Sequence, residues 1–186
     1  MFIVYTGNGK GKTTAALGLA WRVLGYNKKV IFAQFLKGLE TGEVRLAKRF
    51  KKNLFLYLEG NKYFLTSKFK KPSDKKLFLK IKQAPSNEKE RAKLFFDFII
   101  KETHKKNPFL LILDEINLCF KLKLLDVDYA LKKIDLLTKN LKDVNIVFTG
   151  RYAPKKVKER ADLITEMKEV KHPFQKGRLA QKAIDF

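Results

Sequence analysis

Glycines, lysines and threonines cluster near the N-terminus with the composition of a phosphate-binding loop. Between a β-rich run, 2–5, and a helical pattern, 13–24, the chain reads Gly7-Asn8-Gly9-Lys10-Gly11-Lys12-Thr13-Thr14. Glycines allow backbone N–H groups to converge on phosphate oxygens, and the helix N-terminus adds partial positive charge. Lys12 would reach bridging phosphate oxygens, and the Thr13 hydroxyl would bind Mg²⁺. The segment therefore predicts a site for a polyphosphate.

The glycine spacing of this loop differs from the common pattern of Gly, four residues, then Gly-Lys-Ser/Thr. The position that the pattern reserves for the first glycine is Thr6, and Gly7 follows one place later. The alternative interpretation is an ordinary turn with chance glycines. A strand pattern before the loop and a helix pattern after it favour the phosphate site.

Two carboxylates and one arginine follow other strand-like segments. Asp114 and Glu115 come directly after an apolar run, and Arg151 follows the strand-like segment 145–148 and Thr149-Gly150. Because the carboxyl ends of parallel strands meet at one edge of a sheet, we expect these side chains near the phosphate loop. One or both acids would hold Mg²⁺, and Arg151 would contact phosphate. The alternatives are a loop carboxylate and a surface arginine with no role in the site.

Strand and helix patterns alternate along the chain. This alternation predicts an α/β fold, with a mainly parallel sheet covered by helices on both faces. The segment 60–86 is expected to be a long loop, and Trp21 is expected to pack in the core with Leu17 and Leu24. No repeat or linker divides the sequence, so residues 1–186 are predicted to form a single P-loop nucleotide-binding domain. The expected strands are 2–5, 30–35, 54–58, 109–113, 145–148 and 163–170.

The charge of the chain is its most unusual bulk property, with 41 basic residues against 19 acidic ones and a net charge of +22. Such an excess favours anionic partners, including nucleic acid. Only 7 of the basic residues are arginine, whereas 34 are lysines dispersed along the chain. Base recognition relies more on arginine, so the excess is better explained by composition and solubility, and nucleic-acid binding is disfavoured. A functional basic surface stays the alternative.

The sequence contains no membrane-spanning or secretory signal. Its longest apolar runs, such as 109–113, are far shorter than a transmembrane helix requires. No signal-peptide pattern stands at the N-terminus, and Cys119 is the single cysteine. We therefore expect a soluble cytoplasmic protein without an internal disulfide.

Several blocks, in order along the chain, resemble the ATP:corrinoid adenosyltransferases of the RecA-like P-loop type. The offset glycine pattern at 6–16 is similar to the loop of that family. The other matching blocks are 34–38, 42–43, 113–115, 149–151, 161–162, 170–174 and 180–186. The blocks extend over nearly the whole chain, and their combination is what makes the resemblance specific.

The resemblance implies an enzyme of adenosylcobalamin biosynthesis or salvage. In this family Co(I) of a reduced corrinoid attacks the 5′-carbon of ATP and inorganic triphosphate departs. Lys12, Glu115 and Arg151 would be the catalytic residues, 7–14 would bind ATP, and Thr13 with Asp114 or Glu115 would hold Mg²⁺. The resemblance also implies that the triphosphate lies in the loop reversed relative to ordinary P-loop ATPases. A homodimer and a reductase or flavin that supplies electrons to the corrinoid are expected on the same basis.

The corrinoid side of the site departs from the family pattern. Relatives carry a glycine-aromatic-Thr-Trp segment after the third strand, where this chain has 59–66. Tyr63 or Phe64 would take the place of those aromatics, or would pack in the loop or the core. His172 is a candidate corrinoid contact within a family-like block. The competing functions are a nucleic-acid-stimulated P-loop ATPase and a nucleotide-binding module or small kinase.

Overall fold

The computed structural model describes residues 1–37, 41–47, 49, 52–60, 63–66, 87–171, 177, 181, 183 and 184, with only the backbone described for 63–66. The strands are β1 (Phe2–Thr6), β2 (Val30–Gln34), β3 (Leu54–Gly60), β4 (Tyr63–Thr66), β5 (Leu110–Asp114), β6 (Asn145–Thr149) and β7 (Leu163–Glu166). The helices are α1 (Lys12–Gly25), α2 (Gly42–Ala47), α3 (Glu88–Lys106), α4 (Ile116–Lys121), α5 (Val127–Asn140) and α6 (Lys155–Arg160).

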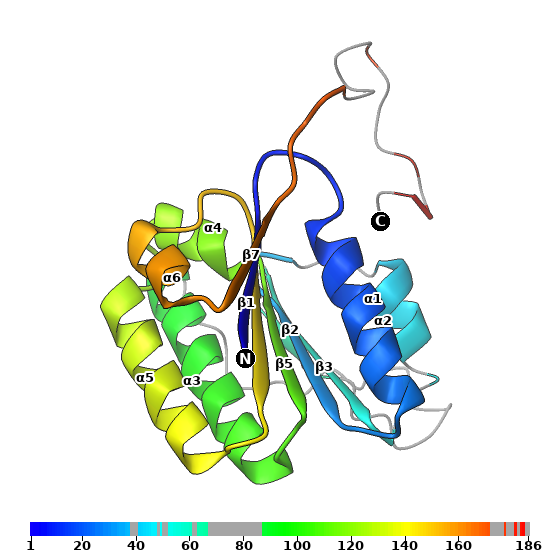
Figure 1. Cartoon of the computed structure of the whole chain (residues 1–186), viewed down its shortest axis with the longest axis vertical. Coiled ribbons are helices and arrows are strands. Elements are labelled where there is room, and N and C mark those ends of the chain that lie inside the picture. The colour runs from blue at the N-terminus through cyan, green and yellow to red at the C-terminus, as the bar shows by residue number, and fades with distance from the viewer. Residues whose placement is uncertain are drawn as a thin grey trace.

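The described strands form one seven-stranded sheet in the order β4-β3-β2-β5-β6-β1-β7. Every neighbouring pair is parallel except β3 and β4, which pair antiparallel. Helices α1 and α2 cover one face, and α3, α4, α5 and α6 cover the other (Figure 1). The predicted α/β fold with a mainly parallel sheet and helices on both faces is confirmed.

The central strands are apolar because helices bury both of their faces. All five residues of β2 and of β5 are buried, which explains why each reads as a continuous hydrophobic run rather than an alternating one. Local side chains then set the helix boundaries. Asn87 accepts a hydrogen bond from the backbone N–H of Lys89 at the start of α3, and Asp126 accepts one from Tyr129 at the start of α5.

Three sequence-based expectations were wrong. Strand β4 lies within 60–86, which had been expected to be a loop, and it adds an antiparallel edge to the sheet. Strand β7 ends at Glu166 rather than at Val170. Trp21 is 57% exposed, because α1 turns a different stripe, Ala16, Ala20 and Val23, toward the sheet. Small residues on that stripe bring the helix close to the strands, and the larger side chains lie on its outer flank.

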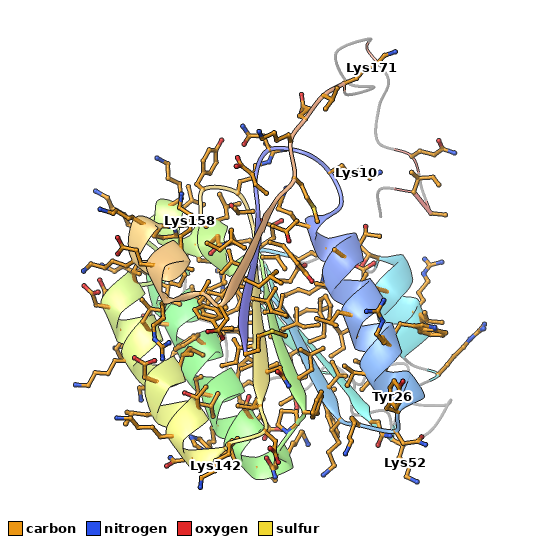
Figure 2. The ribbon with its side chains drawn as sticks, viewed as in Figure 1. Lys10, Tyr26, Lys52, Lys142, Lys158 and Lys171 are labelled. Atoms are coloured by element: carbon orange, nitrogen blue, oxygen red, sulfur yellow. The ribbon has the colours of Figure 1, made fainter. Side chains whose placement is uncertain are left out.

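No helix among the described residues has both the length and the apolar character needed to cross a membrane. The labelled lysines Lys10, Lys52, Lys142, Lys158 and Lys171 lie on several sides of the molecule rather than on one face (Figure 2). This distribution agrees with the dispersed pattern of lysines in the sequence.

Candidate functional site

The loop between β1 and α1 takes a backbone path that depends on glycine. Gly7 and Gly11 have φ angles of 96° and 114°, in a region that side chains with a Cβ rarely adopt. The chain beyond β7 runs against this loop, so that Met167 receives a hydrogen bond from the N–H of Gly9 at 2.7 Å. A Cβ on Gly7 would collide with the Met167 carbonyl, and one on Gly9 would lie 2.6 Å from that of Lys168. Two glycines are therefore required by packing as well as by the phosphate-loop path.

Lys12 lies inside the curve of this loop. Its side chain is the first of α1, and its ammonium group donates to the carbonyl oxygens of Gly7 at 2.8 Å and Gly9 at 2.7 Å. Burial lowers the pKa of Lys12, an effect that the negative charges of Glu115 and Asp114 oppose. The loop thus holds a cation at its centre, where a phosphate oxygen could replace the carbonyl partners.

Asp114 joins three elements at the carboxyl edge of the sheet. It is fully buried at the end of β5. The Thr13 hydroxyl of α1 donates to its Oδ1 at 3.0 Å, and the Thr149 hydroxyl of β6 donates to the same oxygen at 2.6 Å. The Gln34 amide of β2 donates to Oδ2 at 3.0 Å. These bonds fix the carboxylate and connect it directly to the start of α1.

Glu115 occupies the turn between β5 and α4. Its φ is 62°, a left-handed conformation that is unusual for a residue with a side chain. The Glu115 N–H donates to the Thr149 hydroxyl at 2.9 Å, so that Thr149 is bonded to both acids. Burial, followed by the charge of Asp114, raises the pKa of Glu115, while Lys12, Lys37 and Arg151 partly offset that rise. The acid therefore lies among three cations without being neutralised by a direct bond to one of them.

Strand β6 lies between β5 and β1, which brings its last residues between the acids and the phosphate loop. Gly150 follows with a φ of 122°, and a Cβ there would lie 3.2 Å from a carboxylate oxygen of Glu115. Arg151 is the next residue and is exposed. The predicted convergence of the loop, the acids and Arg151 at one sheet edge is therefore what the structure shows, with Thr149 as the connecting side chain.

These groups border a cavity of about 750 Å³. The predicted site residues that line it are Asn8, Gly9, Lys10, Gly11, Lys12, Thr13, Thr14, Glu115 and Arg151. Asp114 lies behind this surface, fully buried. Along α1 the cavity continues as an apolar wall that includes Leu17 and Trp21. A volume of this size fits a nucleotide-sized ligand with its charged end at the loop. Lys10 extends from the loop that leads into α1 (Figure 2).

Sequence reasoning missed a second group of polar residues, which lies after β2. The Gln34 amide donates to Glu43 Oε1 at 3.2 Å, and the Lys37 ammonium donates to the same oxygen at 2.8 Å. Lys37 and Glu43 both line the cavity. The matching blocks 34–38 and 42–43 contained these residues, but nothing in their spacing showed that they meet the acid of β5.

The donor set fits a nucleotide-bound Mg²⁺. The Thr13 hydroxyl and the Asp114 carboxylate are hard oxygen ligands within 3.0 Å of each other. Within the described residues no group of three or more His, Cys, Asp or Glu side chains could hold a metal by themselves. A buried acceptor, Gln34 Oε1, has no hydrogen-bond partner among the described residues and could receive one from a metal-bound water. Two protein ligands completed by phosphate and water are typical of Mg²⁺.

The corrinoid candidates are only partly located. Tyr63 and Phe64 belong to β4, where they pair in register with Gly60 and Glu59 of β3. Their side chains and His172 lie outside the described part of the structure. Their proposed contacts stay predictions.

Comparison with protein families places these features in a known group. The family model described as ATP:corrinoid adenosyltransferase BtuR/CobO/CobP matches residues 1–186. The chain is similar to the corrinoid adenosyltransferase of Pseudomonas aeruginosa, with 32% identity over all of this chain and 83% of the relative. It is 29% identical to that of Escherichia coli strain K12, over all of this chain and 85% of the relative.

Comparison with solved structures supports the fold independently. The crystal structure of a KaiC-like protein from the hyperthermophilic archaeon Pyrococcus horikoshii OT3 superposes with a TM-score of 0.50. The match covers 99% of this chain and 74% of that protein at 15% sequence identity. At this identity the likeness concerns the fold alone, and it supports the RecA-like P-loop architecture.

Proposed function

Because the chain belongs to the ATP:corrinoid adenosyltransferase family, we propose that it transfers the 5′-deoxyadenosyl group of ATP to the Co(I) of a corrinoid through the site described above. The product is an adenosylcorrinoid of cobalamin biosynthesis or salvage, and inorganic triphosphate is released. The observation that supports this assignment best is the joining of the phosphate loop to Asp114 through Thr13, in a chain matched by the family over its whole length.

This reaction requires the protein to position the two substrates and to stabilise charge, and it does not require a general base. The electron pair of Co(I) forms the bond to C5′ of ATP, the C5′–O bond breaks, and its electrons remain on the departing triphosphate. No proton has to be removed from the nucleophile. The side chains must hold the two substrates in line, stabilise the charge that develops on the leaving oxygen and exclude water.

The cationic side of the site stabilises the leaving triphosphate. Lys12 exchanges its carbonyl partners for phosphate oxygens, and Arg151 approaches from the end of β6. The backbone of the loop surrounds the phosphates. Its binding residues are Gly7, Asn8, Gly9, Lys10, Gly11, Lys12, Thr13 and Thr14.

The acidic side would hold a Mg²⁺ ion bound to the nucleotide. Thr13 would be one protein ligand of this ion, and Asp114 or Glu115 would supply the carboxylate. The ion would neutralise part of the triphosphate charge. Thr149 and Gln34 keep the Asp114 carboxylate in one orientation, which limits the reorganisation needed when the nucleotide binds.

The corrinoid is proposed to lie near the β4 edge, with Tyr63 or Phe64 against the ring and His172 as a further contact. The register of β4 supports this, since Phe64 lies opposite Glu59, next to the strand that carries Gln34. We further propose one domain over residues 1–186, a homodimer, a cytoplasmic location and a reductase or flavin as the electron source. These four proposals rest on the family and on the sequence.

One assay tests the proposed function. The protein is mixed anaerobically with MgATP and chemically reduced cobalamin, and the cobalt–carbon bond is followed by absorbance while phosphate products are separated by ion exchange. We expect adenosylcobalamin and intact triphosphate in equal amounts. ADP with inorganic phosphate, above all if DNA or RNA accelerates its formation, would instead support a P-loop ATPase.

A further inference from the structure

The turn that follows β2, residues 35–37, is held by hydrogen bonds from its backbone amides. Phe35 donates its backbone N–H to the carbonyl of Asp114 at 2.9 Å. Leu36 donates its N–H to the Glu59 carboxylate at 3.0 Å, and Lys37 donates its N–H to the Glu59 carbonyl at 2.7 Å. Three successive amides are thus bonded to the two strands that flank β2. The turn cannot move without breaking bonds on both sides.

The backbone conformation of Leu36 is unfavourable by itself. Its φ of 57° is left-handed, which is unfavourable for a residue with a branched side chain. Such a conformation persists when its surroundings over-determine it, and it is found most often where a functional group must be aimed. The residue whose direction this turn sets is Lys37.

The partner of the turn is itself a buried charge. The Glu59 side chain is 1% exposed, and its Oε1 receives a 2.7 Å bond from Arg91 Nε of α3, whose side chain is 10% exposed. Removing an ion pair from water is costly, so this pair does not have to stabilise the fold. It does hold the Glu59 carboxylate beneath the turn, with its second oxygen accepting from the Leu36 amide.

Lys37 extends from this turn into the nucleotide cavity. Its side chain is 28% exposed and lines the cavity together with Lys12, Glu115 and Arg151. Its bond to Glu43 at 2.8 Å uses one of its three donors, which leaves donors for an anion. Burial, and then the charge of Asp114, raise the pKa of Glu115. The positive charge of Lys37 is among those that lower that pKa.

We propose that Lys37 is a further triphosphate-binding residue, and that the Glu59–Arg91 pair is the brace that aims it. The polyphosphate is then held between Lys12 from the loop after β1 and Lys37 from the turn after β2. In the adenosyl transfer, Lys37 donates hydrogen bonds to phosphate oxygens as the C5′–O electrons pass to the leaving group. Glu59 and Arg91 are positioning residues, because they act through Lys37. The inference deepens the proposed function and rests on it for the identity of the leaving group.

The direct test measures binding of inorganic triphosphate with Mg²⁺ by calorimetry, without corrinoid. Lys37→Met should weaken this binding by about 10- to 100-fold, the range for one hydrogen-bonded charge. Lys37→Arg should retain most of it. Lys142→Met is the matched control, since Lys142 lies at the opposite end of the molecule from Lys10 (Figure 2) and should bind as the parent does. Parent-like binding by Lys37→Met would overturn the proposal.

Double-mutant comparisons test whether the Glu59–Arg91 pair positions Lys37. Glu59→Gln, and the milder Arg91→Lys, should weaken triphosphate binding while Lys37 is present and add little once Lys37 is methionine. If Glu59→Gln does not fold, as a melting curve would show, Arg91→Lys carries this test alone. Additive losses in both pairs would show that the buried ion pair acts only on the fold, and would refute the brace.

The steady-state assay separates this inference from the proposed function. If the parent forms adenosylcobalamin and triphosphate while Lys37→Met has the same kcat and KM for ATP, the role of Lys37 is wrong and the function stands. If the parent forms ADP, the function is wrong, while calorimetry still reports whether Lys37 contacts a polyphosphate.

Discussion

Two turns at the same edge of the sheet reach unusual backbone conformations by different means. The loop after β1 uses glycine, with Gly7 and Gly11 at φ angles of 96° and 114°. The turn after β5 uses Glu115 at 62°, a residue with a full side chain. Glycine adopts such angles at little cost, whereas Glu115 needs the Thr149 hydroxyl to hold its amide. The first turn depends on its own residues, and the second on a neighbouring strand.

The loop after β1 and the turn after β5 therefore differ in which residues keep them in place. The glycine loop is proposed to present backbone N–H groups and Lys12 to an anion, and substitutions there should act on the loop itself. The acid turn carries Asp114 and Glu115, whose positions depend on Thr149, Thr13 and Gln34. Substitutions in those partners should therefore reach the acids without touching them.

The largest effect is expected from Lys12→Ala. The variant loses the cation at the centre of the loop, and adenosyl transfer should become undetectable in the anaerobic assay while the far-ultraviolet circular dichroism spectrum stays that of the parent. Lys142→Ala, at the far end of the molecule, serves as the control. Unchanged kinetics of Lys12→Ala would remove the phosphate loop from the mechanism.

Gly7→Ala should be the most destabilising change in the loop. The new Cβ combines a left-handed φ with a collision against the Met167 carbonyl, so we expect a loss of roughly 2–4 kcal/mol in unfolding free energy. Gly18→Ala within α1 is the matched control. It meets nothing within 4 Å and should stabilise by about 0.5–1 kcal/mol. Urea denaturation measures both. Equal effects would show that the loop does not depend on glycine.

Thr149→Val tests the acid turn through its partner. The isosteric change removes the bonds to Asp114 and to the Glu115 amide, both buried or half-buried, and should cost about 1–3 kcal/mol and lower kcat. Thr138→Val removes a hydroxyl that donates only to helix carbonyls and should be nearly neutral. If Thr149→Val leaves both stability and kcat unchanged, the acid turn is self-supporting and the contrast fails.

Glu115→Gln should give the smallest effect on stability, and one of opposite sign. The raised pKa means that the folded protein favours the protonated acid, so its contribution to stability is present below about pH 4.3, the unfolded value, and is lost as the pH rises through the folded pKa. Because glutamine is neutral at every pH, the variant does not lose this stability as the pH rises. At neutral pH the melting temperature should increase, by roughly 2–4 °C per kcal/mol gained, while activity falls.

Melting curves at several pH values check the last prediction. The gain should shrink toward zero below about pH 4, where the parent acid is also neutral. Glu88→Gln, with a side chain 67% exposed, should show no comparable gain at neutral pH. A destabilised Glu115→Gln at neutral pH would mean that the three nearby cations outweigh burial.

The sequence alone determined the fold class, the family, and the positions of the glycine loop and of the two acids at the end of a strand. It could do so because a glycine cluster or a continuous apolar run is recognisable within a short stretch of sequence and does not depend on contacts with distant residues. The local signal was misleading for Trp21, since an apolar stripe does not say which of two adjacent stripes faces the sheet.

Only the tertiary structure decided how the site is held together. The left-handed turns at Leu36 and Glu115, and the meeting of Thr149, Gln34 and Asp114, join residues far apart in the chain. The packing of Met167 against Gly7 is of the same kind. Such contacts leave no periodic trace in the sequence, because each depends on strand order and register. The buried Glu59–Arg91 pair is the clearest case, since nothing in the sequence links the two residues and they meet only where β3 packs against α3.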